Sequence, residues 1–260
     1  NNIRFIDTAQ VYGTAESKIG NWKDHNNSFR IIDKLKGIKE KIITKDTIKR
    51  IDNDLKESLS KLKIGKIDAL LLHSVDDLHK EGSNLLKQWL IEQKKSGTVS
   101  RLGVSVYSAE DINGINNDLL NVIQLPLSIY DQRLLKDGTI EELKMRGVEI
   151  HARSIYLQGL ILEEAKNWPS WVKSSTKKHH KKFEEFCIRN DKRKIEFAIE
   201  FVKAQELIDA VTIGIAKKED LIEILGLWSQ PTQIRKDINW YNWSLEDTGI
   251  LDPRLWPKSE

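Results

Sequence analysis

The sequence alternates short apolar runs with longer stretches of helical periodicity along most of its length. In residues 46–62, Ile48, Ile51, Leu55, Leu59 and Leu62 recur at the spacing of one helix face. Parallel strands need long crossover connections, usually helices, so this alternation predicts a parallel sheet covered by helices. Seven runs have the length and composition of buried strands: "IRFIDT", "FRIIDKL", "IDALLLH", "RLGVSVY", "NVIQLPLS", "VEIHARSI" and "AVTIGI".

We expect helices between consecutive strands and after the last one. The first of these, over 46–62, has Asp46 or Thr47 as its expected cap. The spacing leaves no room for a linker, so residues 1–260 are expected to form a single domain. The other expected helices are 84–97, 108–115, 138–147, 192–205 and 217–228.

Seven strand and helix units are one short of a (β/α)₈ barrel, the TIM barrel. Residue 1 is Asn, and the first strand begins within a few residues of it. We therefore expect a TIM barrel whose first β/α unit is absent from this chain. An open doubly wound sheet ranks second, because no Gly-x-Gly-x-x-Gly sequence follows any of the strands.

Charge and composition limit the classes of partner that the protein is expected to bind. The 42 basic and 39 acidic side chains give a net charge of +3, which predicts no nucleic-acid partner. No apolar run approaches the length of a membrane span, and no leader pattern opens the chain, so no membrane partner is expected. The single cysteine, Cys187, is consistent with a reducing compartment. We expect a cytoplasmic protein with a small-molecule ligand; the oligomeric state stays open.

Four polar side chains follow three of the expected strands. Asp7 ends the first strand and Tyr12 lies in the loop after it, while Lys34 and His73 end the second and third. In a barrel, catalytic groups lie at the C-terminal ends of strands, so these four side chains are expected on one rim. Each alone has a structural explanation as a cap, a surface charge or a hydrogen-bonded core residue. Lys45 competes for the lysine role, but Lys34 is preferred because it ends a strand.

The sequence "DTAQVYG" resembles the Asp-Thr-Ala-x-x-Tyr-Gly signature of the aldo-keto reductase superfamily. The segments "LKESLSKLKIGKIDALLLH", "GVSVYS", "VIQLPLS" and "VTIGIAKKEDLIEIL" are similar to further segments of that family, in the expected order. "ARSIYLQGL" and "LDPRLWPK" look closest to bacterial members of sugar and surface-polysaccharide pathways.

The resemblance implies a catalytic tetrad of Asp7, Tyr12, Lys34 and His73 and the reduction of an aldehyde, ketone or sugar carbonyl. Hydride addition leaves negative charge on the carbonyl oxygen, so a proton donor must lie beside it. Tyr12 suits that role, since a nearby ammonium stabilises the phenolate and makes proton exchange easier near neutral pH. Lys34 would supply the ammonium, Asp7 would hold it, and His73 would orient the substrate oxygen.

The resemblance also implies a nicotinamide cofactor, NAD or NADP. The residues expected at it are Ser105, Gln124, Arg153, Gly214, Lys217, Lys218 and Asp220. Asp220 lies where many members carry an arginine for the 2′-phosphate of NADP. A carboxylate there should repel this phosphate, which favours NAD, although Lys217 and Lys218 offer positive charge for it.

Three departures from the family pattern support an alternative, a non-catalytic nicotinamide-nucleotide-binding regulatory protein on the same fold. Val106 replaces an Asn, Arg153 replaces an aromatic residue that stacks on the nicotinamide, and Asp220 replaces the arginine. Asp33 also replaces a more usual Thr or Ser beside Lys34. The adjacent His179 and His180 are expected in a solvated loop entering a helix rather than at a metal, because they lack i,i+4 spacing.

Overall fold

The computed structural model describes residues 3–22, 29–231 and 238–257. The chain falls into two compact units. The N-terminal unit consists of the residues up to Gln124 together with Leu143–Glu149, and the C-terminal unit consists of Leu125–Glu142 and Ile150–Glu260. The expectation of a single domain stays a prediction.

All seven expected strands are present in the described part of the chain. They are β1 (Phe5–Asp7), β2 (Arg30–Leu35), β3 (Ile67–Leu72), β4 (Val99–Ser105), β5 (Val122–Pro126), β6 (Glu149–Arg153) and β7 (Ala210–Val211). Every pairing between them that the structure records is parallel, as the alternating pattern predicts. An α/β fold with parallel strands is therefore confirmed, while an absent first β/α unit stays a prediction.

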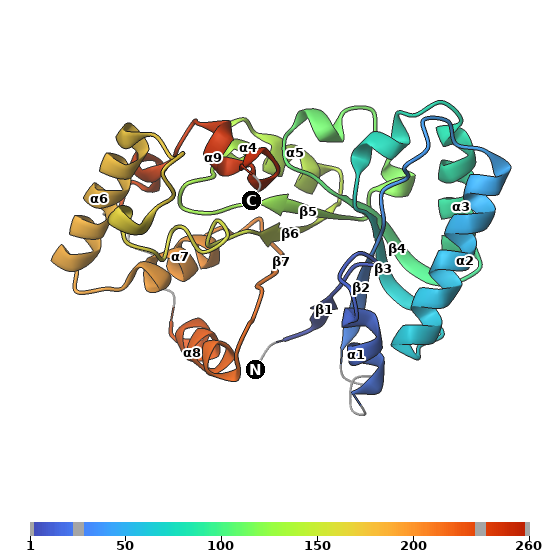
Figure 1. The fold of residues 1–260 in the computed structure, drawn as a ribbon, viewed down its shortest axis with the longest axis horizontal. Coiled ribbons are helices and arrows are strands. Elements are labelled where there is room, and N and C mark those ends of the chain that lie inside the picture. Colours follow the sequence, from blue (N-terminus) through green and yellow to red (C-terminus); the bar gives the residue numbers. More distant parts are fainter. Residues whose placement is uncertain (1–2, 23–28, 232–237, 258–260) are drawn as a thin grey trace. The chain divides into compact units, whose positions relative to one another are not determined.

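In the N-terminal unit, strands β1 to β5 pair in chain order, each with the next. Two long helices, α2 (Lys45–Leu62) and α3 (Ser83–Lys95), run along the outside of this sheet, with the short helix α1 (Ala15–Asn21) beside α2 (Figure 1). α2 is capped by Thr44, whose hydroxyl accepts the Thr47 N–H at 3.3 Å. The expectation of Asp46 or Thr47 as the cap was wrong by two or three residues, and the Thr47 hydroxyl instead accepts the Thr44 N–H.

The inner face of this sheet carries an apolar layer below the strand ends. Ile32, Ala69, Leu71 and Val122 pack together from β2 to β5, with Phe5 of β1 against them. Gly103 of β4 is required for this close packing. A Cβ at that position would lie 1.9 Å from the Val122 carbonyl oxygen and 2.7 Å from Leu71.

The C-terminal unit contains the parallel pair β6 and β7 and the helices α6 (Ser174–Arg189), α7 (Lys194–Lys203) and α8 (Lys218–Ser229) (Figure 1). α7 and α8 were expected, and so were α5 (Thr139–Met145) and, in the N-terminal unit, α2 and α3. The expected helix over 108–115 is only the short 3-10 turn Glu110–Ile112. Short helices α4 (Arg133–Lys136) and α9 (Thr248–Leu251) complete the α-helices of the described residues.

The loop expected around His179 and His180 is wrong, because both residues lie within α6. Thr176, His180, Phe183 and Cys187 form the buried side of this helix. Their spacing of four, three and four residues is helical, and the many lysines between them lie on the other faces.

Candidate functional site

Asp7 and Lys34 form a buried ion pair at the C-terminal ends of β1 and β2. Lys34 Nζ lies 2.5 Å from Asp7 Oδ2, with the two side chains 3% and 17% exposed. The parallel register places Asp7 opposite Ile32, so Lys34 lies one side-chain step beyond it on the same face. Lys34 Nζ also donates to the Thr8 carbonyl at 3.2 Å. The ammonium is thus held by a carboxylate and a backbone oxygen from the end of β1.

Gln124 holds the other oxygen of the same carboxylate. Its Nε2 donates to Asp7 Oδ1 at 2.6 Å, across 117 residues of sequence. Both Asp7 oxygens are therefore engaged, one by the lysine and one by the amide. Sequence reasoning assigned Gln124 to the cofactor alone and missed this bond, because it depends on the curvature that brings β1 and β5 together.

Tyr12 lies in the turn between β1 and α1. Its N–H donates to the Ala9 carbonyl at 2.9 Å, and its carbonyl accepts the Ala15 N–H at 3.1 Å. Gly13 follows with a φ of +58°, a left-handed conformation that favours glycine. The Tyr12 ring centroid is 5.4 Å from Lys34 Nζ, within the range of a cation–π contact, and the residue is 49% exposed. The phenol is therefore next to the ammonium and open to solvent.

His73 directly follows β3, where its N–H donates to the Leu35 carbonyl at 3.2 Å, and the residue is exposed. Three members of the expected tetrad thus lie at strand ends of the N-terminal unit, and Tyr12 lies in the turn that follows β1. Lys45 is exposed at the first turn of α2, so the geometry favours Lys34 over it as the partner of Asp7.

Ser105 and Gln124 are register partners on β4 and β5, so their side chains lie on the same face. Ser105 is 9% exposed, and neither its hydroxyl nor the Gln124 side-chain oxygen makes a hydrogen bond to the described residues. A hydroxyl donor beside an amide oxygen acceptor matches the two ends of a carboxamide. The donor set therefore fits the carboxamide of a nicotinamide. Val106, after Ser105, is fully buried and adds no polar group.

The other residues expected at the cofactor lie in the C-terminal unit. Arg153 ends β6, and its guanidinium donates to the Ser154 hydroxyl at 3.2 Å. Gly214, Lys217 and Lys218 are exposed where the chain enters α8. The Asp220 carboxylate accepts the Lys217 N–H at 3.1 Å, so Asp220 caps this helix. Capping is a structural role that sequence reasoning had not assigned to it.

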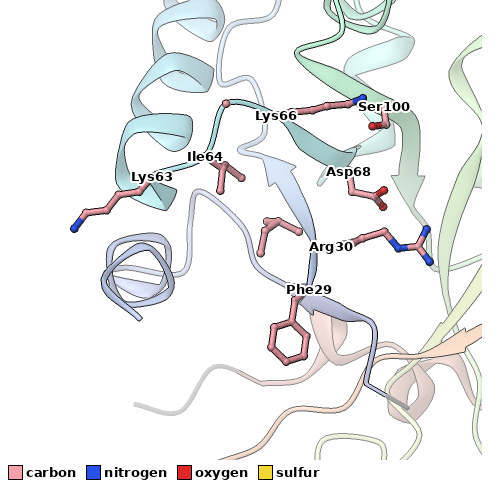
Figure 2. A pocket seen from close by; sticks show the side chains of 9 residues that line it. Phe29, Arg30, Lys63, Ile64, Lys66, Asp68 and Ser100 are labelled. Carbon is pink, nitrogen blue, oxygen red and sulfur yellow. The ribbon is translucent and has the colours of Figure 1, made fainter. Parts of the chain in front are cut away.

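A pocket of about 530 Å³ lies at the opposite edge of the N-terminal unit (Figure 2). It is formed where β2, β3 and β4 begin, whereas the tetrad lies where strands end. Two of its charged groups are already engaged: the Arg30 guanidinium lies 4.5 Å from the Phe5 ring centroid, and Asp68 pairs with Arg101. The pocket lining consists of Phe29, Arg30, Ile31, Lys63, Ile64, Gly65, Lys66, Asp68 and Ser100.

Two further features bear on other ligands. Within the described ranges, no group of three or more His, Cys, Asp or Glu side chains is placed to hold a metal ion. No helix built from described residues combines the length and apolar character needed to cross a membrane.

The sequence comparison gives the class of protein. Residues 1–237 match the model of the aldo/keto reductase family. The chain therefore belongs to that family, whose members are oxidoreductases of carbonyl compounds that bind a nicotinamide cofactor.

Solved structures show the same fold. The apo form of an aldo-keto reductase from Bacillus halodurans is 19% identical with a TM-score of 0.70, over 93% of this chain and 80% of that one. Its holo form is 20% identical with a TM-score of 0.65, over 88% of this chain and 77% of that one. A glycerol dehydrogenase from Gluconobacter oxydans is 20% identical with a TM-score of 0.59, over 86% of this chain and 80% of that one. At these identities the likeness concerns the fold alone, and it supports the barrel class over a doubly wound sheet. The comparison with curated protein sequences gives no match.

Proposed function

We propose that this protein reduces the carbonyl group of a small aldehyde, ketone or sugar to an alcohol, using NADH or NADPH, with Tyr12 as the proton donor. The observation that carries the proposal is the ion pair of Asp7 and Lys34 with the Tyr12 ring 5.4 Å from the ammonium. A bound nicotinamide would supply the hydride, since no side chain can.

The role of Tyr12 follows from where negative charge develops. Hydride addition turns the carbonyl oxygen into an alkoxide, which needs a proton. The Tyr12 hydroxyl gives up its proton to this oxygen and becomes a phenolate. The Lys34 ammonium is close enough to stabilise that phenolate, and the low exposure of the ammonium strengthens the interaction. Tyr12 is solvent-exposed, so a small substrate can reach it.

Asp7 and Gln124 act on the lysine rather than on the substrate. A buried ammonium without a counter-ion would be driven to its neutral form. The Asp7 carboxylate is the counter-ion of the Lys34 ammonium, and the bond from Gln124 to Asp7 Oδ1 fixes the carboxylate orientation. His73, at the end of β3, would donate to the substrate oxygen and set its direction. Ser105 and Gln124 would hold the nicotinamide carboxamide.

The variant Tyr12→Phe tests the proton donor. Because phenylalanine keeps the ring beside Lys34 and removes only the hydroxyl, turnover should fall by about 10²-fold or more with cofactor binding preserved. Steady-state reduction of a panel of aldehydes, ketones and sugars with NADH and NADPH measures this. Tyr241→Phe, at a tyrosine that is 56% exposed in the C-terminal unit, is the matched control and should leave turnover unchanged.

The competing function is a nicotinamide-nucleotide-binding regulator without turnover, which the departures at Val106, Arg153 and Asp220 favour. Fluorescence titration with NADH and NADPH separates the two. Binding of either nucleotide with turnover that depends on Tyr12 supports the reductase. Binding without turnover of any carbonyl in either protein supports the regulator, and undiminished turnover in Tyr12→Phe refutes the assignment of Tyr12.

A further inference from the structure

Lys34 has an acidic neighbour on the other face of β2. Successive strand residues point to opposite faces, so while Lys34 reaches Asp7, the side chain of Asp33 points towards the helices outside the sheet. Asp33 is 0% exposed. Its Oδ1 accepts the backbone N–H of Lys34 at 2.8 Å. Its Oδ2 is buried and makes no hydrogen bond to the part of the chain that the structure describes.

This bond replaces one rung of the ladder between β1 and β2. The Thr8 N–H donates to the Ile32 carbonyl at 2.9 Å, and the Gln10 N–H donates to the Lys34 carbonyl at 3.1 Å. In a parallel ladder, the rung between these two is a bond from the Lys34 N–H to the Thr8 carbonyl. Here the Lys34 N–H donates to Asp33 instead. The Thr8 carbonyl accepts the Lys34 ammonium at 3.2 Å.

We propose that Asp33 is a positioning residue for the Lys34 ammonium: by taking the Lys34 N–H, it leaves the Thr8 carbonyl free to hold Nζ beside Asp7 and Tyr12. The proposal rests on the function proposed above for Lys34. It explains why a buried acid stands next to a buried lysine without touching its ammonium. The Asp33 carboxylate accepts the backbone N–H of Lys34, and the Thr8 carbonyl that this leaves free accepts the Lys34 ammonium.

The surroundings of Asp33 make this positioning sensitive to pH. Burial, the nearby Glu16 of α1 and, more weakly, Asp7 raise the pKa of Asp33 to about 7, although the Lys34 N–H and the Lys34 ammonium act to lower it. Glu16 is itself 2% exposed, and it pairs with Lys61 of α2 at 3.8 Å. An ionised carboxylate is a stronger acceptor than a protonated one. The hold on the Lys34 N–H therefore tightens as pH rises through 7.

Two substitutions separate the acceptor from the charge. Asp33→Asn keeps an oxygen for the Lys34 N–H and removes the charge, whereas Asp33→Leu removes both and fits a buried site. In Asp33→Leu, the Lys34 N–H returns to the Thr8 carbonyl and displaces the ammonium. We expect kcat to fall about tenfold with the KM for cofactor unchanged, since a small misplacement of a catalytic group has effects of this size or larger. Asp33→Asn should stay within about threefold of wild-type kcat and lose the inflection near pH 7.

A second readout does not need activity. In protein labelled with ¹⁵N-lysine, the amide signal of Lys34, assigned by its loss in Lys34→Arg, should shift with pH around 7 in the wild type and not in Asp33→Asn. A Lys34 amide that ignores pH in this range overturns the proposal, as does Asp33→Leu with wild-type kcat and pH profile. Equal losses of kcat in both variants also overturn it, because charge and not the acceptor would then matter. If no carbonyl is turned over at all, the proposed function fails while the amide titration still tests Asp33.

Discussion

Two polar clusters, one in each unit, are built from different groups. The cluster in the N-terminal unit is an ion pair, Asp7 with Lys34, and one of its neighbours, Tyr12, is 49% exposed. The cluster in the C-terminal unit is a chain of hydrogen bonds through His180. The Tyr130 hydroxyl and His180 Nδ1 lie 2.5 Å apart, and His180 Nε2 lies 2.7 Å from the Glu163 carbonyl. Tyr130 and His180 are both fully buried.

The chemistry of each cluster follows from this difference. A charge is buried at a cost, so a buried lysine next to an accessible phenol supports the catalytic role proposed for Lys34 and Tyr12. The histidine network has no solvent access and no open position for a substrate. Because the Glu163 carbonyl can only accept, His180 carries its proton on Nε2, and Nδ1 accepts from the Tyr130 hydroxyl. Trp168 stacks on the imidazole at a centroid distance of 4.4 Å. We therefore interpret this second cluster as structural.

Removing the cation of the first cluster should have the largest effect. Lys34→Met keeps the volume of the side chain but leaves Asp7 held only by Gln124 and leaves the Tyr12 phenolate without its ammonium. We expect kcat to fall by about 10²-fold or more, because proton transfer in the transition state is impaired. Lys45→Met, at the exposed lysine in the first turn of α2, is the control in the same kinetic assay. Similar losses in the two variants would contradict the choice of Lys34.

Removing the histidine of the second cluster should lower stability instead. His180→Phe leaves the Tyr130 hydroxyl without its partner inside an aromatic cluster, while the Glu163 carbonyl keeps the Lys194 ammonium as a donor. The free energy of unfolding should fall by about 1–3 kcal/mol, the cost of one stranded buried polar group. Denaturant titration measures this, and the kcat of the folded fraction should be unchanged. His179→Phe is the matched control, since His179 makes one hydrogen bond, to the Trp243 carbonyl at 3.1 Å. An equal loss there would contradict a special role for His180.

The same variant has a pH signature with a definite sign. Burial lowers the pKa of His180 below its ordinary value of 6.5, against the opposing effects of the Glu163 carbonyl and Glu184. The unfolded chain therefore takes up this proton at a higher pH than the folded protein does. The contribution of neutral His180 to stability is complete above pH 6.5 and is lost as pH falls towards the lowered pKa. The difference in stability between wild type and His180→Phe should thus be smaller at pH 5 than at pH 7.5.

The sequence predicted the features that depend on local patterns and missed those that depend on contacts between distant residues. Strand periodicity and the rule that catalytic groups lie at strand ends are local signals, and they predicted all seven strands and led to Asp7 and Lys34. The bond between Gln124 and Asp7 joins residues 117 apart, and no local pattern encodes it. The hydrogen bond from the Lys34 N–H to Asp33, in place of one to the Thr8 carbonyl, likewise depends on the register of β1 and β2.

The sequence contains a periodic pattern that predicts the burial of His180, but the many lysines around it suggested an exposed segment. Lysines surround both histidines in "STKKHHKKFEE", which suggested a solvated loop. The spacing from Thr176 through His180 to Phe183 and Cys187 is that of an amphipathic helix, and it indicates a buried face. Periodicity was the better guide here, because a helix can bury one stripe while its other faces carry the charges.

The smallest expected effect concerns Asp220, where one side chain has a structural role and a proposed functional one. Asp220→Ala removes the helix-capping bond to the Lys217 N–H, which should lower stability by about 1 kcal/mol. Asp220→Asn keeps the capping oxygen and removes only the charge, so its stability should stay close to that of the wild type. If the carboxylate repels the 2′-phosphate of NADP, both variants should bind NADPH more tightly relative to NADH, by less than about tenfold, since exposed charges interact weakly. Thermal unfolding and fluorescence titration with both nucleotides separate the two roles. If the preference between NADPH and NADH changes only in Asp220→Ala, the lost helix cap is its cause. If it changes equally in both variants, the lost charge is its cause.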